Sequence, residues 1–336
     1  MRRNILVTGG MGFIGSNFIN YYFDKYPHKD FSIVNLDCLT YAANVKNVEG
    51  IDKYKNYSFV KGDICNEDVV NYIFSHYDIN YVVNFAAHSH VDNSINNPQP
   101  FFQTNVLGTQ NLLNCANKAW ASTNNHKFLH ISTDEVMGSL PLCSKEKWTE
   151  GAVLNPRSPY SASKAGAEHV CMAYYHTYKL PVVITRSSNN FGPRQHAEKF
   201  IPVIINSLFN KNSIPIYGNG SNMRDWIYVE DNCKCIDLIL NKGELGNVYN
   251  IGSGREINNK NLVDIIISIF CKLFSENKNF YNKLISYVED RKGHDLKYSI
   301  NINKIKKLGW EPSLNNSFYD ELQKTIMWYK NEQKTD

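Results

Sequence analysis

Short apolar runs alternate with longer amphipathic segments through the first half of the chain. The β-branched and aromatic runs that predict strands cover residues 5–8, 32–36 (beginning at Phe31), 58–60, 81–85, 128–132 and 182–186. Between them, apolar residues recur at helical spacing over residues 12–23, 68–74, 104–119 and 161–178. Strands that alternate with helices predict βαβ units, and therefore an α/β fold built on a doubly wound parallel sheet.

The pattern becomes less regular after about residue 187. Prolines and glycines interrupt it between residues 193 and 220, and helical spacing returns over 200–209 and 262–273. We therefore predict two parts. Residues 1–186 would form the first domain, and residues 187–336 would form a smaller C-terminal α/β lobe that is interleaved with it.

A glycine-rich turn follows the first predicted strand and opens the first predicted helix. Gly9, Gly12 and Gly15 permit a tight turn and a close approach of the backbone to a pyrophosphate. The helix start at Phe13 and Ile14 offers free N–H groups to the phosphates. Turns also collect glycine for purely conformational reasons, which is the alternative. The strand before the turn and the helix after it favour a Rossmann domain that binds a dinucleotide.

An acidic residue stands at the end of the second predicted strand, about 20 residues beyond the turn. The carboxylate of Asp37 can hold the hydroxyls of the adenosine ribose, and it would repel a 2′-phosphate. The sequence therefore predicts NAD rather than NADP. Asp63, at the end of the third predicted strand, either faces the adenine or caps a turn, and the sequence leaves both open.

A tyrosine stands just before the predicted helix at 161–178, and a lysine follows four residues later within that helix. Tyr160 and Lys164 would share a helix face, so that the ammonium lies near the phenol. An unperturbed tyrosine has a pKa of about 10, and a neighbouring cation lowers it by stabilising the phenolate. The same spacing arises by chance on many helices. Behind a dinucleotide-binding turn it indicates an acid–base pair.

Further motifs carry a resemblance to a known family. They are Asn-Phe-Ala-Ala at 84–87, Ser-His-Val-Asp at 89–92, Ser-Thr-Asp-Glu-Val at 132–136, Ser-Asn-Asn-Phe-Gly-Pro at 188–193, Glu-Lys-Phe-Ile-Pro at 198–202, Arg-Asp-Trp at 224–226, Gly-His-Asp at 293–295 and Leu-Gly-Trp at 308–310. Nearly end to end, the chain resembles extended short-chain dehydrogenases/reductases. Within them it is similar to nucleotide-sugar 4,6-dehydratases of the dTDP-glucose and UDP-glucose type. The Asp-Glu pair is the most informative motif, because sugar epimerases of this fold typically lack it.

The resemblance implies that a nucleotide-linked glucose loses water by way of a 4-ketone. Tyr160 would take the proton of the C4 hydroxyl while hydride passes to NAD⁺, Thr133 would hold that oxygen, and Lys164 would hold the cofactor ribose. Glu135 would abstract the C5 proton, and a protonated Asp134 would donate to the departing C6 hydroxyl. Adjacent carboxyls with opposite roles need pKa values that their surroundings push apart. A plain Thr-Asp-Glu helix cap is the alternative.

The resemblance also assigns the contacts of cofactor and substrate, and no metal is expected. The predicted cofactor-binding residues are Gly9, Gly12, Phe13, Ile14, Gly15, Asp37, Asp63, Ile64, Ala86, Ala87, Tyr160 and Lys164. The predicted substrate-binding residues are Ser89, Thr133, Asn189, Lys199, Phe200, Pro215, Tyr217, Arg224, Asn259, Arg291 and His294. The guanidinium groups of Arg224 and Arg291 suit the diphosphate, because they pair with phosphate oxygens in a bidentate manner.

Three positions depart from the family pattern. His88 stands where bacterial dTDP-glucose enzymes usually carry Glu, Asn93 where they carry Arg, and Met137 where they carry Tyr. Residues 91–94 are closer to eukaryotic UDP-glucose dehydratases. The base and the sugar therefore stay open. A UDP-N-acetylglucosamine dehydratase and a nucleotide-sugar 4-epimerase are the nearer alternatives, and a non-catalytic dinucleotide-binding protein is a remote one.

Composition and charge narrow the possible partners. A chain of 336 residues with 43% hydrophobic residues can bury a sizeable core. The formal charge of +4 suits an anionic small ligand but is too weak to indicate nucleic acid. The apolar run near the N-terminus is too short for a signal peptide, and no stretch is long enough to span a membrane. The eight cysteines are scattered and are interpreted as reduced thiols. Together with the lack of a signal peptide and of a membrane span, they predict a cytoplasmic protein.

The predicted helices at 104–119 and 161–178 carry long apolar stripes. In the family that the chain resembles, the corresponding helices pair across a two-fold axis as a four-helix bundle. The resemblance therefore implies a homodimer. The alternative is that both stripes only cover the sheet.

Overall fold

The computed structural model describes residues 2–120, 125–312 and 318–333. Within these ranges lies a seven-stranded parallel sheet in the order β10–β6–β5–β4–β1–β2–β3. Its strands are β1 (Arg3–Thr8), β2 (Phe31–Asp37), β3 (Tyr57–Lys61), β4 (Tyr81–Asn84), β5 (Lys127–Thr133), β6 (Val182–Ser187) and β10 (Val248–Ile251). The predicted doubly wound α/β fold is confirmed, and the six predicted strands are β1 to β6.

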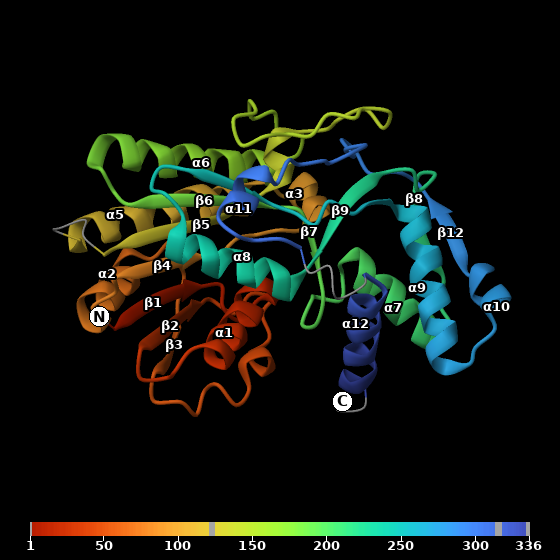
Figure 1. The fold of residues 1–336 in the computed structure, drawn as a ribbon, viewed down its shortest axis with the longest axis horizontal. Coiled ribbons are helices and arrows are strands. Elements are labelled where there is room, and N and C mark those ends of the chain that lie inside the picture. Colours follow the sequence, from red (N-terminus) through yellow and green to blue (C-terminus); the bar gives the residue numbers. More distant parts are fainter. Residues whose placement is uncertain (1, 121–124, 313–317, 334–336) are drawn as a thin grey trace.

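Helices cover both faces of this sheet (Figure 1). One face carries α1 (Phe13–Lys25) and α8 (Val229–Lys242), and the other carries α2 (Glu67–Tyr77), α5 (Thr109–Ala119) and α6 (Pro159–Tyr178). Successive residues of β1 belong to different cores. Ile5 and Val7 pack with α1 and α8, whereas Leu6 packs with α2 and α5. A strand that is buried on both faces needs an unbroken apolar run, which is why these strands were visible in the sequence.

The strand at one edge of the sheet comes from the second half of the chain. β10 pairs in parallel with β6 and places Ile251 opposite Ser187. β10 was not predicted, because Asn250 interrupts its apolar run and the preceding Gly246 and Asn247 are typical of a turn. The division after residue 186 stays a prediction, and the sheet takes strands from both sides of it.

The second half also builds a smaller lobe, at the right in Figure 1. It holds a three-stranded sheet of β7 (Asn189–Phe191), β9 (Met223–Tyr228) and β11 (Glu256–Asn258), and a two-stranded sheet of β8 (Ile214–Tyr217) and β12 (Ile285–Val288). Around a core of its own lie α7 (Phe200–Asn210), α9 (Asn259–Phe274) and α12 (Phe318–Glu332), of which α7 and α9 contain the predicted helices. Shorter helices are α3 (Val91–Asn96), α4 (Gln99–Phe102), α10 (Lys278–Asn282) and α11 (Asn303–Lys307).

The predicted helix at 104–119 contains two geometries. A π-helical segment, Gln103–Gly108, runs directly into α5. Its Asn105 side chain accepts a hydrogen bond from the N–H of His88 (2.9 Å) and donates to Ser163 Oγ (2.8 Å). The wide turn thus ties the loop after β4 to α6. Such single π turns inside helices are frequent at functional sites.

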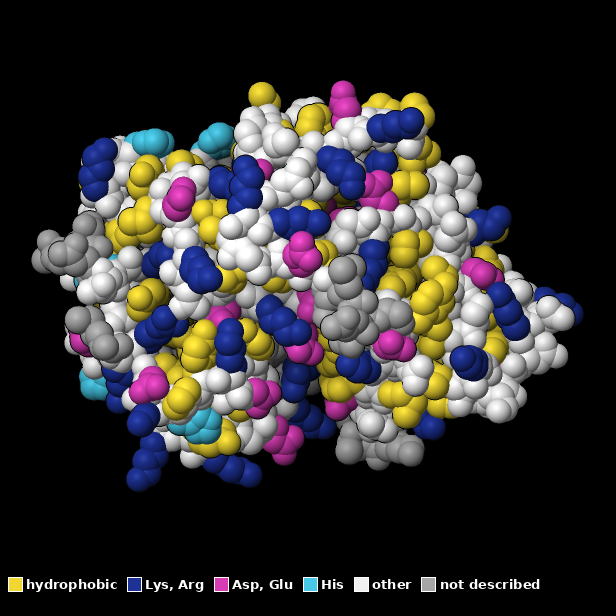
Figure 2. All heavy atoms as spheres, viewed as in Figure 1, with side chains coloured by type: hydrophobic (Ala, Val, Ile, Leu, Met, Phe, Trp, Pro, Cys, Tyr) yellow, Lys and Arg dark blue, Asp and Glu magenta, His cyan; other side chains and the backbone are white. Residues whose placement is uncertain are grey.

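The outer surface mixes charges of both signs. On the face drawn in Figure 2, Lys and Arg side chains are interspersed with Asp and Glu. No helix within the described residues combines the length and the apolar character that a membrane span requires. The same part of the chain holds no group of three or more His, Cys, Asp or Glu side chains that could bind a metal ion.

Candidate active site

A pocket of about 270 Å³ lies at the carboxyl ends of β1, β2 and β4. Every residue predicted to bind the cofactor lines it. Gly9 has φ +68°, and a Cβ there would lie 2.8 Å from the backbone nitrogen of Ala86. A Cβ on Gly15 would collide with the carbonyl oxygen of Gly9. These two positions therefore exclude any side chain, and the backbone leaves a cradle in front of the first turn of α1, where free N–H groups favour phosphates.

Asp37 lies in the lining of this pocket and is nearly buried. Its two carboxylate oxygens accept hydrogen bonds from the N–H groups of Met11 (2.9 Å) and Leu39 (2.8 Å). Burial raises the pKa of Asp37, and these two bonds oppose the rise. The bonds fix the carboxylate in the pocket lining, so the residues present fit a dinucleotide without a 2′-phosphate. Asp63 also lines the pocket, and its Oδ1 caps the N–H of Cys65 (2.8 Å).

The predicted acidic pair follows β5 directly. Asp134 and Glu135 open a short 3₁₀ turn, and Thr133 is its N-cap. Thr133 Oγ1 lies 3.3 Å from both the N–H of Glu135 and Oδ1 of Asp134. The cap that the sequence allowed for this segment is present, and the acid–base role of the two carboxyls stays a prediction. Asp134 is buried, whereas Glu135 is partly exposed.

The two carboxyls sit in different electrostatic surroundings. Burial raises the pKa of Asp134 well above its usual value, and the charges of Glu135 and Asp225 raise it further. Burial also raises the pKa of Glu135, but the cations of Arg291, Arg224 and Lys199 oppose that rise. The pKa of Asp134 is thus raised well above its usual value, whereas cations oppose the rise at Glu135, and this order is the one that acid and base roles for the two carboxyls require.

Helix α6 brings Tyr160 and Lys164 to the inner end of the pocket. Its start is fixed by a capping box between Ser158 and Ser161, with Pro159 in the first turn. Such a cap typically contributes about 1 kcal/mol to stability. Tyr160 lies two residues beyond the cap, so its position depends on where the helix begins.

The surroundings of Tyr160 differ from the expectation drawn from the sequence. Burial, and then the charge of Glu135, raise the pKa of Tyr160, and a hydrogen bond with Thr133 lowers it. Lys164 was expected to lower this pKa. Instead its ammonium donates to the carbonyl oxygen of Ile131 (2.5 Å), and burial lowers the pKa of Lys164 to about 8. The strand carbonyl thus holds the lysine, and the hydroxyl of Thr133 is the group that favours a phenolate.

The predicted substrate residues fall into two groups. Lys199 lines the pocket with Ser89, whose carbonyl oxygen accepts from its ammonium (3.0 Å). Arg224 and Arg291 belong to the lobe, and their charges lower the pKa of Glu135. The other predicted residues lie on lobe elements outside the described pocket lining: Asn189 on β7, Phe200 at the start of α7, Pro215 and Tyr217 on β8, Asn259 at the start of α9, and His294 after β12. Of these, Tyr217 and His294 are in ring contact at 6.1 Å.

The three departures from the family pattern have separate environments. His88 lines the pocket, and burial lowers its pKa. Asn93 donates to the hydroxyl of Tyr41 (3.4 Å) near the pocket mouth. Met137 is buried in a small apolar cluster with Ala165 of α6. Its methylene chain fills core space, so it has no polar role in the site.

Several residues that line the pocket were missed by sequence reasoning. They are Leu36, Cys38, Thr40, Ala42, Ala43, Gly62, Phe85, His88, Thr104, Ile131, Ser132, Gln195, His196 and Glu198. Most stand next to a predicted residue, and that proximity was a usable signal. Gln195 and His196 were not accessible in this way, because they have no predicted neighbour and reach the pocket from the lobe.

A dinucleotide cradle that ends at a tyrosine and a lysine on one helix defines a short-chain dehydrogenase/reductase, and the added lobe places it among the extended ones. The sequence profile of the GDP-mannose 4,6 dehydratase family matches residues 6–322. The chain therefore belongs to this family.

Individual relatives agree with this assignment over nearly their full lengths. The low-salt glycan biosynthesis protein Agl12 of Haloferax volcanii is 47% identical over 97% of this chain and 98% of its own. The dTDP-glucose 4,6-dehydratase of Haemophilus influenzae is 43% identical over 97% of each. The crystal structure of dTDP-glucose 4,6-dehydratase from Bacillus anthracis in complex with NAD has a TM-score of 0.87 and 43% identity, and the match covers 99% of this chain and 98% of that one.

Proposed function

We propose that this protein is a hydro-lyase that uses bound NAD to convert dTDP-glucose or UDP-glucose to the corresponding 4-keto-6-deoxyglucose. The observation that carries the proposal is the adjacent pair Asp134 and Glu135, which acts on the pKa of Tyr160 and whose own pKa values are raised to different extents. A 4-epimerase moves a hydride at C4 alone and has no use for two further carboxyls. The pair therefore favours dehydration over epimerisation.

The chain's own residues supply the proton transfers. NAD⁺ supplies a hydride acceptor for the C4 hydrogen and later returns the hydride to C6. Tyr160, as its phenolate, accepts the C4 hydroxyl proton. Thr133, which forms a hydrogen bond with Tyr160, holds the same oxygen of the sugar. Glu135 takes the C5 proton, which the 4-ketone has made acidic, and Asp134 gives its proton to the departing C6 hydroxyl. Water leaves, and the proton on Glu135 returns to C5. The proton that Tyr160 gained is released to solvent, and Asp134 takes up a proton from solvent, so the protein ends in its starting state.

A product assay with three substrates tests this proposal. Purified protein is incubated separately with dTDP-glucose, UDP-glucose and UDP-N-acetylglucosamine, and the alkali-induced absorbance of the 4-keto product is measured. We expect a signal with one of the two glucose nucleotides, and the stronger of them identifies the base. A signal with the acetamido sugar alone would reassign the sugar. A 4-epimer without any keto product, or no reaction with all three, would overturn the dehydratase.

The charge of Asp37 should determine the choice of cofactor. We expect the protein to bind NAD(H) much more tightly than NADP(H), because a 2′-phosphate would meet this carboxylate. Asp37→Ala should relax the preference by about tenfold, or ~1.4 kcal/mol. Asp37→Asn is the matched control for the loop, since its amide oxygen can still accept from Met11 or Leu39. Calorimetric titration with both cofactors measures the ratio, and equal affinities in the unaltered protein would contradict the prediction.

The helices α5 and α6 should form the interface of a homodimer. Leu107, at the start of this helix pair, is 48% exposed, and Tyr178 at its end is 55% exposed. Light scattering at micromolar concentration should give the mass of two chains. Leu107→Glu should shift the protein toward the monomer. Tyr319→Glu, at an equally exposed site on α12, should not. A monomeric mass for the unaltered protein would refute the dimer.

A further inference from the structure

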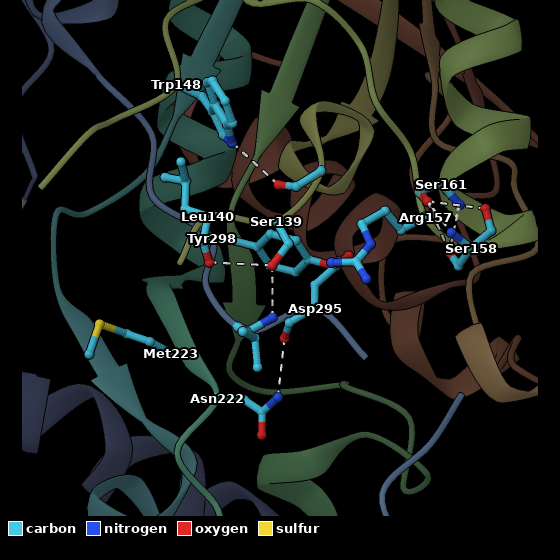
Figure 3. Close-up of polar contacts among 12 residues, drawn as sticks. Ser139, Leu140, Trp148, Arg157, Ser158, Ser161, Asn222, Met223, Asp295 and Tyr298 are labelled. Carbon is cyan, nitrogen blue, oxygen red and sulfur yellow. Dashed lines mark hydrogen bonds and ion pairs between the residues drawn. The ribbon is translucent and has the colours of Figure 1, made fainter. Parts of the chain in front are cut away.

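A short stretch of the lobe, residues 295–301, connects the candidate active site to the loop before α6. Lys297 forms β-bridges with Leu140 of that loop and with Met223 of β9. Ser139 Oγ also accepts from the N–H of Leu296 (2.8 Å). Figure 3 shows Asp295 and Tyr298 of this stretch between Met223 and the Ser158 and Ser161 pair. One segment thus contacts both the strand that carries Arg224 and the loop that leads to Tyr160.

The guanidinium of Arg224 is held by this segment. Its Nη2 donates to the carbonyl oxygen of Asp295 (2.9 Å), and its Nη1 donates to those of Met223 (2.8 Å) and Leu296 (3.4 Å). The ring of Tyr298 lies beneath it, 4.3 Å from Cζ to the ring centroid. Carbonyl oxygens and a ring face orient a guanidinium without neutralising it. Arg224 therefore keeps its positive charge, which acts on both Glu135 and Asp134.

Asp295 anchors Tyr298 from the other side. Its carboxylate is 4% exposed, and Oδ2 accepts from the hydroxyl of Tyr298 at 2.5 Å. Its Oδ1 lies 3.3 Å from Nη1 of Arg157, which immediately precedes the Ser158 cap of α6. In Figure 3 the Arg157 side chain extends from the Ser158 and Ser161 pair toward Asp295 and Tyr298. A continuous polar chain thus runs from the helix cap to the support of Arg224.

We propose that Tyr298 and Asp295 are positioning residues, which hold the charge of Arg224 toward Glu135 and fix that arrangement to the helix that carries Tyr160. The inference rests on the proposed function, because it concerns how the base of the elimination step is kept ionised. Neither residue needs to touch the sugar. Both act through the location of Arg224.

The role has a consequence for pH dependence. Charged and titratable groups that act on Glu135 or are acted on by it are Arg291, Arg224, Asp295, Lys199, Asp134, Tyr160 and Tyr298. The Arg224 charge lowers the pKa of Glu135. If Arg224 moves away, that pKa rises, and the base becomes ionised only at higher pH. The acidic limb of the kcat profile should then shift upward.

Tyr298→Phe is the sharpest variant. It keeps the ring beneath Arg224 and both neighbouring charges, and it removes only the hydroxyl that Asp295 holds. An Asp295 variant is less clean, because the charge of Asp295 itself raises the pKa of Glu135. We expect Tyr298→Phe to move the acidic limb of kcat, and of solvent deuterium exchange at C5, upward by about one pH unit. Tyr319→Phe, an exposed tyrosine on α12, is the matched control and should leave the profile in place.

A second variant tests the tie to α6. Arg157→Gln should shift the acidic limb in the same direction, and Arg157→Lys, which keeps the charge next to Asp295, should restore it. The side chain of Arg157 is 47% exposed, so these variants should fold. A merely structural role would lower turnover or the melting temperature without moving the limb. An unmoved limb in both Tyr298→Phe and Arg157→Gln would overturn the proposal.

A binding measurement separates this inference from the proposed function. Arg224 is predicted to contact the diphosphate, so Tyr298→Phe should weaken calorimetric binding of dTDP or UDP by about tenfold. If the unaltered protein turns over no nucleotide sugar, the dehydratase proposal fails. In that case the calorimetric titration with dTDP or UDP alone decides the role of Tyr298. With turnover, an acidic limb and a diphosphate affinity that are both unchanged in Tyr298→Phe refute the inference and leave the dehydratase intact.

Discussion

Tyr160→Phe should leave bound NAD⁺ oxidised after the nucleotide sugar is added, and turnover should fall by about 10²–10⁴-fold. The phenolate form of Tyr160 receives the C4 hydroxyl proton, and hydride cannot leave C4 unless that proton leaves with it. Phenylalanine keeps the ring, which lies in an edge contact with Phe101, so the pocket should keep its shape. The near-ultraviolet absorbance of NADH in a single turnover measures the loss directly.

The control for this variant lies on the same helix. Tyr178→Phe alters an exposed tyrosine at the end of α6 and should leave cofactor reduction unchanged. Bound NAD and the melting temperature are measured for both variants, so that a lost cofactor is not mistaken for lost chemistry. Reduction of the cofactor at the unaltered rate in Tyr160→Phe would show that another group accepts the proton.

The pH dependence of this step follows from burial. Because burial raises the pKa of Tyr160, the phenolate is scarce at neutral pH, and C4 oxidation should speed up as the pH rises. The hydroxyl of Thr133 partly offsets this. Thr133→Val should therefore raise the pKa of Tyr160, and the rise in the rate of C4 oxidation should occur at higher pH.

The parts of the protein that the sequence predicted well are those specified by neighbouring residues. The glycine turn, Asp37 and the six strands of the first half each depend on a short window, because a buried parallel strand needs a continuous apolar run and a pyrophosphate cradle needs glycines at fixed spacing. All the predicted cofactor residues consequently line one pocket. β10 was missed, since the polar Asn250 interrupts its apolar run and Gly246 and Asn247 before it are typical of a turn.

The electrostatics of the site could not be predicted in the same way. The sequence places Asp134 beside Glu135, but it does not reveal that the charges of Arg291 and Arg224 oppose the rise in the pKa of Glu135, or that Arg224 also opposes the rise in that of Asp134. Those cations come from β9 and from the loop after β12, and only the folded lobe brings them near β5. The bond from Lys164 to Ile131 was hidden for the same reason, because it joins a helix to a strand 33 residues away. Local patterns predict which groups are present, whereas long-range packing determines their pKa values.

Glu135→Gln and Asp134→Asn should both stop the reaction after C4 oxidation. Each variant removes one acid–base group of the elimination, so turnover should fall by about 10²–10⁴-fold. Tyr160 is unaltered in both, and some NADH should therefore still form when the sugar is added. Both substitutions preserve the size of the side chain, and Glu146→Gln, on the exposed loop after the acidic turn, is the matched control that should remain active.

Isotope exchange distinguishes the two carboxyls. Glu135 is the proposed base, because Arg291, Arg224 and Lys199 favour its ionised form, so Glu135→Gln should slow exchange of the C5 hydrogen with solvent deuterium. Asp134 is the proposed acid, because burial and the nearby charge of Glu135 favour its protonated form, so Asp134→Asn should retain that exchange while loss of the C6 hydroxyl stops. Mass spectrometry of the sugar follows both events.

Normal turnover in Glu135→Gln would show that these roles are assigned wrongly, as would a complete loss of C4 oxidation in Asp134→Asn with its fold and NAD content intact. Reversed exchange behaviour would instead exchange the two roles, and the cations around Glu135 would then serve only the diphosphate.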